Sequence, residues 1–189
     1  MQVLANALGS VTLLQPRIFP DSRGWFAETF NQDTFAQLGL PSRFVQDNQS
    51  FSRQGVLRGL HYQLGKPQGK LVRVLQGHIW DVAVDLRPTS PTLGQWAGFH
   101  LKAPSETDPL QMLWIPEGFA HGFLVLSPVA EVLYKTTNSY YPAGERTLLW
   151  NDPALNIDWP LHLLGDAPVL VSEKDALGKP FHSAELPQS

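Results

Sequence analysis

Short apolar runs, rather than long amphipathic repeats, recur along this 189-residue chain. Several runs alternate between apolar and polar positions, most clearly in IWDVAVDL at 79–86. A period of two indicates β-strands with one buried face. We predict strands at 11–14, 25–30, 44–45, 71–75, 78–85, 96–101, 112–115, 122–126, 131–136 and 147–150. Many short strands at regular spacing are typical of an all-β sandwich or barrel.

Helical signals are few, because 16 prolines and 15 glycines interrupt the chain. Residues 32–38 favour a helix of two turns that ends before Gly39 and Pro41. The sequence SEKD at 172–175 indicates a short capped turn. From about residue 153 the chain is rich in proline. We therefore predict one domain, 1–189, whose residues 160–189 form a C-terminal tail that wraps the barrel.

Composition narrows the classes of function. Apolar residues make up 43% of the chain, the formal net charge is −3 and no basic block occurs, so a nucleic-acid surface is not expected. Cysteine is absent, which excludes disulfides, thiolate metal sites and a cysteine nucleophile. No signal peptide and no apolar run of about 18 residues is apparent, so we expect no membrane partner and a cytoplasmic location.

The stretch GVLRGLHYQLGKPQGKLVRVLQG at 55–77 has a spacing that resembles the first motif of the cupin family. His61 matches a metal-ligating histidine of that motif, but Gln63 stands where the second histidine is expected and Lys70 where the glutamate is expected. A partial second motif ends at His121. A lysine ammonium has no lone pair and repels a divalent cation, and two histidines make a poor site. We therefore predict no metal, which disfavours a metal-dependent dioxygenase.

Without a metal, the same cluster suits proton transfer. A neutral His61 can act as a base, and Lys70 and Arg58 can stabilise negative charge. This combination fits removal of a proton next to a carbonyl group, where an enolate must be stabilised.

A longer ordered set of motifs resembles the dTDP-4-dehydrorhamnose 3,5-epimerase family. The set covers about residues 12–160 and includes DSRG at 21–24, FVQDN at 44–48, GVLRGLHYQ at 55–63, QGKLVR at 68–73, LWIPEGFAHGF at 113–123, YKTTN at 134–138 and LWND at 149–152. The resemblance implies a double-stranded β-helix, or cupin jelly roll, and a homodimer that exchanges an N-terminal strand. It also implies no cofactor and a dTDP-linked 4-keto-6-deoxy sugar as substrate, in dTDP-L-rhamnose biosynthesis.

The resemblance also implies residue roles. His61 would be the base that removes protons at C3 and C5, and Asp152 would hold its other ring nitrogen. Lys70, with Arg58, would stabilise the enolate. Tyr134 would return a proton from the opposite face, and His121 would contact the sugar or the enolate.

The nucleotide part of the substrate would contact residues in four parts of the chain. These residues, some of which the resemblance allows a partner subunit to supply, are Arg23, Glu28, Gln46, Asp47, Asn48, Glu145 and Lys174. The sequence departs from the family between residues 102 and 112, where a longer proline-containing stretch predicts a surface loop.

Structural alternatives stay open for several residues. His61 could be a core histidine, Tyr134 an inward-facing aromatic, and the NDP sequence at 151–153 an ordinary turn. Asp81 and Asp85 share one strand face, as pocket residues or as a structural pair. The other histidines, which have no motif around them, are expected to be surface or structural residues: His78, His100, His162 and His182.

Alternative functions also stay open at this point. One alternative is a relative on the same scaffold that epimerises only C3 or only C5, or that acts as a 3,4-ketoisomerase. A non-catalytic cupin that binds a sugar or nucleotide belongs to a different class. It would need no acid and base together.

Overall fold

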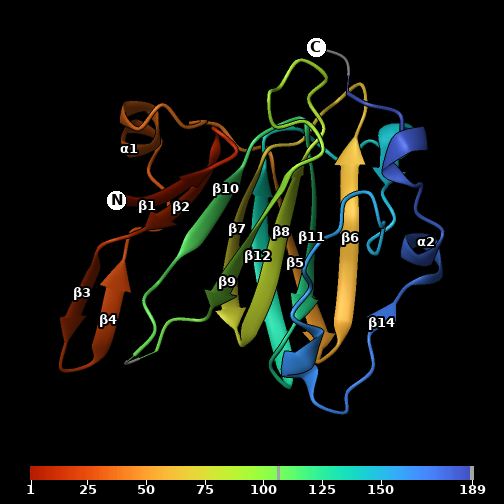
Figure 1. The fold of residues 1–189 in the computed structure, drawn as a ribbon. Helices are drawn as coiled ribbons and strands as arrows, with labels where there is room; N and C mark the ends of the chain where they lie inside the picture. The colour runs from red at the N-terminus through yellow and green to blue at the C-terminus, as the bar shows by residue number, and fades with distance from the viewer. Residues whose placement is uncertain (106, 188–189) are drawn as a thin grey trace.

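A computed structural model describes residues 1–105 and 107–187. Glu106, within the predicted loop, and Gln188 and Ser189, at the end of the predicted tail, lie outside the described residues. Two large sheets face each other, and a separate hairpin extends away from them (Figure 1). The first sheet has the order β1-β2-β10-β7-β12-β5. Its strands are β1 (Gln2–Ala7), β2 (Val11–Gln15), β5 (Gln46–Arg53), β7 (Lys70–Gln76), β10 (Met112–Ile115) and β12 (Val129–Thr136).

The second large sheet has the order β13-β6-β11-β8-β9, and β14 adds to it by pairing in parallel with β6. Its strands are β6 (Val56–Gln63), β8 (His78–Asp85), β9 (Trp96–Lys102), β11 (Phe119–Val125), β13 (Glu145–Thr147) and β14 (Leu170–Val171). The hairpin is formed by β3 (Ile18–Asp21) and β4 (Gly24–Ala27). Two short α-helices, α1 (Gln32–Gln37) and α2 (Glu173–Ala176), lie outside the sheets.

The main core fills the space between the two sheets. Val72 and Val132 come from the first sheet, while Ile79, Ala83 and Phe123 come from the second, and all are buried. Burial of such a side chain contributes about 1.5–3 kcal/mol, so the apolar face of each sheet holds the two layers together. The expected all-β cupin jelly roll is confirmed.

Two predicted strands have the observed bounds, one with alternating residues and one apolar throughout. The strands at 78–85 and 112–115 have the predicted bounds, and the predicted helix at 32–38 is α1. The strand predicted at 25–30 ends earlier, at Ala27, and 44–45 lie just before β5. The sequence did not predict β1, β3, β5, β6 or β14. Polar residues on both faces hide β5, and a bulge hides β6.

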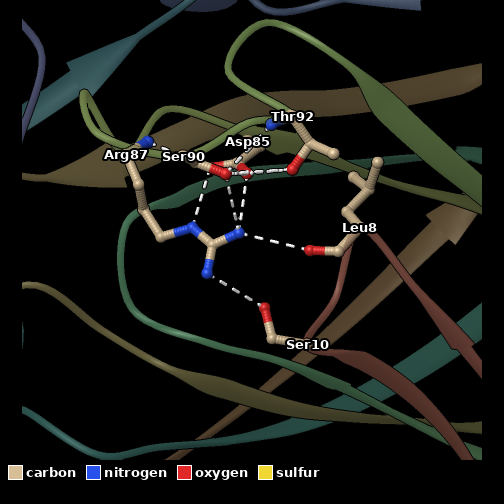
Figure 2. Close-up of polar contacts among 6 residues, drawn as sticks. All are labelled: Leu8, Ser10, Asp85, Arg87, Ser90 and Thr92. Atoms are coloured by element: carbon tan, nitrogen blue, oxygen red, sulfur yellow. Dashed lines mark hydrogen bonds and ion pairs between the residues drawn. The ribbon is translucent and has the colours of Figure 1, made fainter.

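A buried network of hydrogen bonds connects the turn between β1 and β2 to the end of β8 in the second sheet. Asp85, at the end of β8, is fully buried and accepts hydrogen bonds from Arg87, Ser90 and Thr92 (Figure 2). Arg87 also donates to the carbonyl oxygen of Leu8, in the turn between β1 and β2. Burial alone would raise the pKa of Asp85, but these hydrogen bonds lower it to about 2. Asp85 is therefore structural.

The C-terminal segment runs along the outside of β6 (Figure 1). After β14, Ser172 caps α2 by accepting a hydrogen bond from the backbone N–H of Asp175, at 3.1 Å. The predicted capped turn is confirmed. This placement brings α2 alongside β6. Among the residues that the structure describes, no helix has the length and apolar character needed to cross a membrane.

Candidate active site

A cavity of about 370 Å³ lies between the two sheets. Strands of both sheets contribute polar side chains to it, and most of the candidate residues are among them. Its lining consists of Gln46, Asn48, Ser50, Arg58, His61, Tyr62, Gln63, Gln68, Lys70, His121, Phe123, Tyr134, Tyr140 and Glu145.

A bulge in β6 places two of these side chains in the cavity. Arg58 and His61 are three residues apart, so a regular strand would direct them to opposite faces. The register with β11 shifts between the pairs His121–His61 and Phe123–Arg58, which brings both side chains to the same side. Gly59 lies in this bulge with φ of 115°, and a Cβ there would approach Cα of Gly122 at 2.6 Å. Only glycine fits this backbone without strain.

The imidazole of His61 pairs with the carboxylate of Asp175, which lies in the C-terminal segment. Its Nε2 lies 2.6 Å from Oδ1 of Asp175, and the backbone N–H of Gly59 donates to the second carboxylate oxygen at 3.2 Å. Burial would raise the pKa of Asp175, but the pKa is lowered because the contact with His61 and the hydrogen bonds from Gly59 and Ser172 together outweigh burial. An ionised Asp175 therefore accepts from Nε2–H and leaves Nδ1 of His61 free to take a proton.

The prediction that Asp152 pairs with His61 is wrong. Asp152 is buried and accepts hydrogen bonds from the backbone N–H groups of Ala154, at 2.7 Å, and Phe181. It therefore stabilises the turn after Trp150, as the alternative reading of the NDP sequence allowed. Sequence reasoning missed Asp175 as a site residue, although the capped SEKD turn that contains it was recognised.

Lys70 enters the cavity from β7 of the first sheet. Only 7% of the residue is exposed, and its Nζ donates to the backbone carbonyl of His61 at 3.2 Å. Burial lowers the pKa of Lys70 to about 8, against the opposing effects of Asp81 and Glu145. The side chain is therefore mostly a cation at neutral pH, held against the strand that carries His61.

Tyr134 lies on β12, in the sheet that faces His61. It pairs with Val72, and Lys70 pairs with the next inward residue of β12, so Tyr134 and Lys70 share the inner face of the first sheet. Burial raises the pKa of Tyr134, which keeps its phenol protonated at neutral pH. A potential base and a potential acid thus enter one cavity from opposite sheets.

His121 and Asp81 form a second pair at the bottom of the cavity. Nε2 of His121 lies 3.0 and 2.8 Å from the two carboxylate oxygens of Asp81, and both residues are buried. Burial lowers the pKa of His121 despite this carboxylate, so the imidazole is neutral at neutral pH. Asp81 does not line the cavity itself, and its observed role is to pair with His121, which does.

The mouth of the cavity is lined by residues predicted to bind the nucleotide. Gln46 and Asn48 project inward from β5 and are joined by a hydrogen bond of 2.9 Å. Glu145 accepts a hydrogen bond from Tyr140 and forms an ion pair with Lys174, with Nζ 2.5 Å from Oε2. Burial would raise the pKa of Glu145, but these two partners lower it.

Comparison with known proteins shows which family the chain belongs to. The family model described as dTDP-4-dehydrorhamnose 3,5-epimerase matches residues 5–183. The chain belongs to this family. The Pseudomonas aeruginosa dTDP-4-dehydrorhamnose 3,5-epimerase is 54% identical over 186 residues, with 98% of each chain covered. The Salmonella typhimurium enzyme is 51% identical over 178 residues, with 93% of each chain covered.

A solved structure shares the fold over the whole chain. The dTDP-6-deoxy-D-glucose-3,5-epimerase of Legionella pneumophila, in complex with dTDP-4-keto-L-rhamnose, superposes with a TM-score of 0.91 at 44% identity. The alignment covers 100% of this chain and 98% of that chain. This chain is therefore an epimerase of the 3,5-epimerase family, and family relatives bind dTDP-linked sugars.

Four predicted nucleotide-binding residues of this epimerase do not line the cavity, although one of them, Lys174, pairs with Glu145, which does. Asp47 projects from the opposite face of β5 to Gln46 and Asn48, and it pairs with Lys135 at 2.9 Å. Arg23 lies in the β3–β4 hairpin, where its exposed side chain pairs with Asp21 at 2.6 Å. Glu28, just after the hairpin, is exposed as well. Within one chain the structure does not bring Asp47, Arg23 or Glu28 to the site.

Proposed function

We propose that this chain epimerises dTDP-4-dehydro-6-deoxy-D-glucose at both C3 and C5, giving dTDP-4-dehydro-L-rhamnose. The observation that carries the proposal is the position of His61 and Tyr134, which reach one cavity from facing sheets. Lys70 enters the same cavity from the strand next to that of Tyr134. Inversion needs a proton removed from one face of a carbon and another delivered to the opposite face. The names of relatives about 50% identical favour this reaction over epimerisation of a single carbon.

In the first step, Nδ1 of His61 takes the proton from C3 or C5. Both carbons are next to the C4 ketone, which makes their protons acidic. The electrons of the broken C–H bond move onto the C4 oxygen, which gives an enolate. Asp175 supports this step, since its carboxylate at 2.6 Å from Nε2 stabilises the imidazolium that forms.

The enolate needs positive charge near the C4 oxygen. Lys70 supplies a buried ammonium, and Arg58 lines the same cavity with its Nε held by Ser52 at 3.0 Å. Charged donors fixed in a partly dry cavity stabilise a developing oxyanion strongly, because they need little reorganisation. These residues take the place that a metal ion has in metal-dependent cupins.

In the second step, Tyr134 delivers its phenolic proton to the opposite face of the same carbon. The C4 ketone re-forms, and proton exchange with solvent then resets Tyr134 and His61. Neutral Tyr134 is the form that its buried position favours. His121 would contact the sugar from the bottom of the cavity.

The nucleotide would lie at the mouth, against Gln46, Asn48, Glu145 and Lys174. Arg23, Glu28 and Asp47 would complete its binding only in a homodimer, with the first two carried by the N-terminal region of the partner subunit.

Two features support a dimer. Strand β1 lies at a sheet edge with Val3 and Leu4 exposed, and the β3–β4 hairpin exposes Phe19, Trp25 and Phe26. Sedimentation of the purified chain would test the dimer. The cytoplasmic location stays a prediction.

The first experiment is NMR of the substrate incubated with the protein in D₂O. Deuterium at both C3 and C5, with dTDP-L-rhamnose after addition of a reductase and NADPH, is the expected result. Deuterium at one carbon would instead indicate a mono-epimerase, and no deuterium would refute the proposal. His61→Asn, which removes the base with little change in volume, should lower exchange at both carbons by about 10²-fold or more.

A further inference from the structure

Gln63 stands where the cupin motif has a metal-ligating histidine, and the proton transfers proposed above do not use it. It is the last residue of β6 and lines the cavity, yet only 5% of the residue is exposed. A buried side-chain amide needs hydrogen-bond partners, because leaving it unpaired costs free energy. The partners of Gln63 therefore indicate what it does.

Two connecting loops supply these partners. Nε2 of Gln63 donates to the backbone carbonyls of Lys66, at 2.8 Å, and Ser139, at 3.4 Å. Its Oε1 accepts from the backbone N–H of Tyr141 at 3.0 Å. Lys66 belongs to the loop between β6 and β7, whereas Ser139 and Tyr141 belong to the loop that follows β12. Both side-chain N–H groups are bound to carbonyl oxygens, so the amide joins the two loops and has no N–H left for a ligand.

Tyr140, between Ser139 and Tyr141, is the residue that these contacts hold in place. Its side chain lines the cavity, and about half of the residue is exposed. Its backbone N–H donates to Oε1 of Gln46 at 2.8 Å, and its hydroxyl donates to Oε2 of Glu145 at 2.7 Å. Gln46 and Glu145 are proposed to bind the nucleotide, so Tyr140 lies between two residues of that subsite.

We propose that Gln63 is a positioning residue for nucleotide binding: its amide joins residues 139–141 to the loop between β6 and β7 and thereby fixes Tyr140 at the mouth before the substrate binds. The inference rests on the proposed function, because that function places the nucleotide at the mouth. A loop that is ordered in advance loses less conformational entropy on binding, which raises affinity. Gln63 acts through Tyr140 and takes no part in the proton transfers.

Other contacts hold the loop after β12 on either side of its middle. Gln68 donates to the backbone carbonyl of Asn138 at 2.8 Å, and the backbone N–H of Leu64 donates to the carbonyl of Gly144 at 2.8 Å. Neither contact involves the amide of Gln63. Replacing that amide should therefore free the middle of the loop while its two ends stay attached.

The test measures the binding of dTDP to the purified protein by isothermal titration calorimetry. Gln63→Met keeps an unbranched side chain but cannot donate a hydrogen bond, so the dissociation constant should rise about fivefold. Gln54→Met is the matched control. Gln54 also donates to a backbone carbonyl, that of Leu126 at 3.0 Å, but it lies outside the cavity in the turn between β5 and β6. The control should bind dTDP as the wild type does, and an unchanged constant in Gln63→Met would overturn the inference.

Steady-state kinetics separate positioning of the mouth from a general defect of β6. In Gln63→Met, KM for the dTDP-linked substrate should rise about fivefold while kcat changes by less than about twofold, because the groups that transfer protons are intact. His61 lies two residues before Gln63 on the same strand. A distorted strand would move His61 and lower kcat, and a loss of kcat as large as the rise in KM would overturn the inference.

A double-mutant cycle tests whether Gln63 acts through Tyr140. In a Tyr140→Ala background, adding Gln63→Met should change the dissociation constant of dTDP by less than about twofold, because the side chain that Gln63 positions is already gone. The same fivefold effect in both backgrounds would overturn the inference, since it would mean that Gln63 acts by another route.

If Gln63→Met does not fold, hydrogen exchange of the ligand-free wild type supplies a second measurement. The backbone N–H of Tyr141 should exchange about 10²-fold more slowly than an unprotected amide. Rapid exchange there would overturn the inference, because the loop would then become ordered only on binding. A wild type that binds dTDP and shows the expected effects of the variants, but epimerises no substrate, would instead count against the proposed reaction alone.

Discussion

Replacing Lys70 with methionine should remove a pH-dependent penalty from the folded state. Methionine keeps the unbranched shape of the side chain but carries no charge. Burial lowers the pKa of Lys70 from 10.5 to about 8, so the folded protein binds this proton less well than the unfolded chain does. Because one pKa unit corresponds to about 1.36 kcal/mol, the charged lysine costs about 3 kcal/mol of stability at about pH 7.

The sign of the pH effect follows from this shift. Between about pH 8 and about pH 10.5 the unfolded chain retains the Lys70 proton while the folded protein has lost it, so stability rises with pH. Integration from about pH 7 to about pH 9.5 gives the wild type a gain of about 2 kcal/mol from Lys70. Lys70→Met lacks that gain, and all other groups titrate in both proteins.

The assay is urea unfolding of the wild type and Lys70→Met at both pH values and at equal protein concentration. The difference in unfolding free energy between the two proteins should change by about 2 kcal/mol in favour of the wild type at the higher pH. A constant difference would refute the reasoning, because it would mean that Lys70 keeps its ordinary pKa in the folded protein. The loss of the hydrogen bond to His61 shifts the difference equally at both pH values and does not affect the test.

Three further substitutions test separate parts of the site. Tyr134→Phe should retain deuterium exchange better than epimerisation, because the base is intact while the far-face donor is lost; equal losses would contradict separate roles. Asp175→Asn should lower kcat about 10²-fold or more, because the imidazolium of His61 loses its carboxylate. Asp152→Asn is the control: it weakens only a turn and should keep near-normal kcat under the same conditions. Gly59→Ala should lower the urea midpoint, because the new Cβ meets backbone at 2.6 Å; an unchanged midpoint would show that the bulge tolerates a side chain.

The sequence predicted much of the fold because the central strands carry apolar, often β-branched residues and are buried, as β8, β10 and β11 show. Strand β8 has the predicted bounds because both of its faces carry apolar residues, Ile79 and Ala83 in the core between the sheets and Val82 and Val84 in a second apolar cluster, so the run is easily recognised. Strand β5, with the sequence QDNQSFSR, was missed because polar side chains occupy both faces: Gln46 and Asn48 face a polar cavity, while Asp47 faces outward. A strand that lines a polar site thus loses the hydrophobic alternation by which strands are recognised.

The same physics explains the error at Asp152 and the missed partner of His61. Asp152 lies in a turn segment and Asp175 in the short helix α2, and local sequence cannot distinguish a carboxylate that accepts backbone N–H groups from one that accepts an imidazole N–H. The distinction depends on β14, a two-residue strand that pairs with the start of β6 and brings α2 alongside the bulge at Gly59. A contact between residues 114 positions apart is decided by that pairing, so the pair of His61 and Asp175 becomes visible only once the C-terminal segment is placed in space.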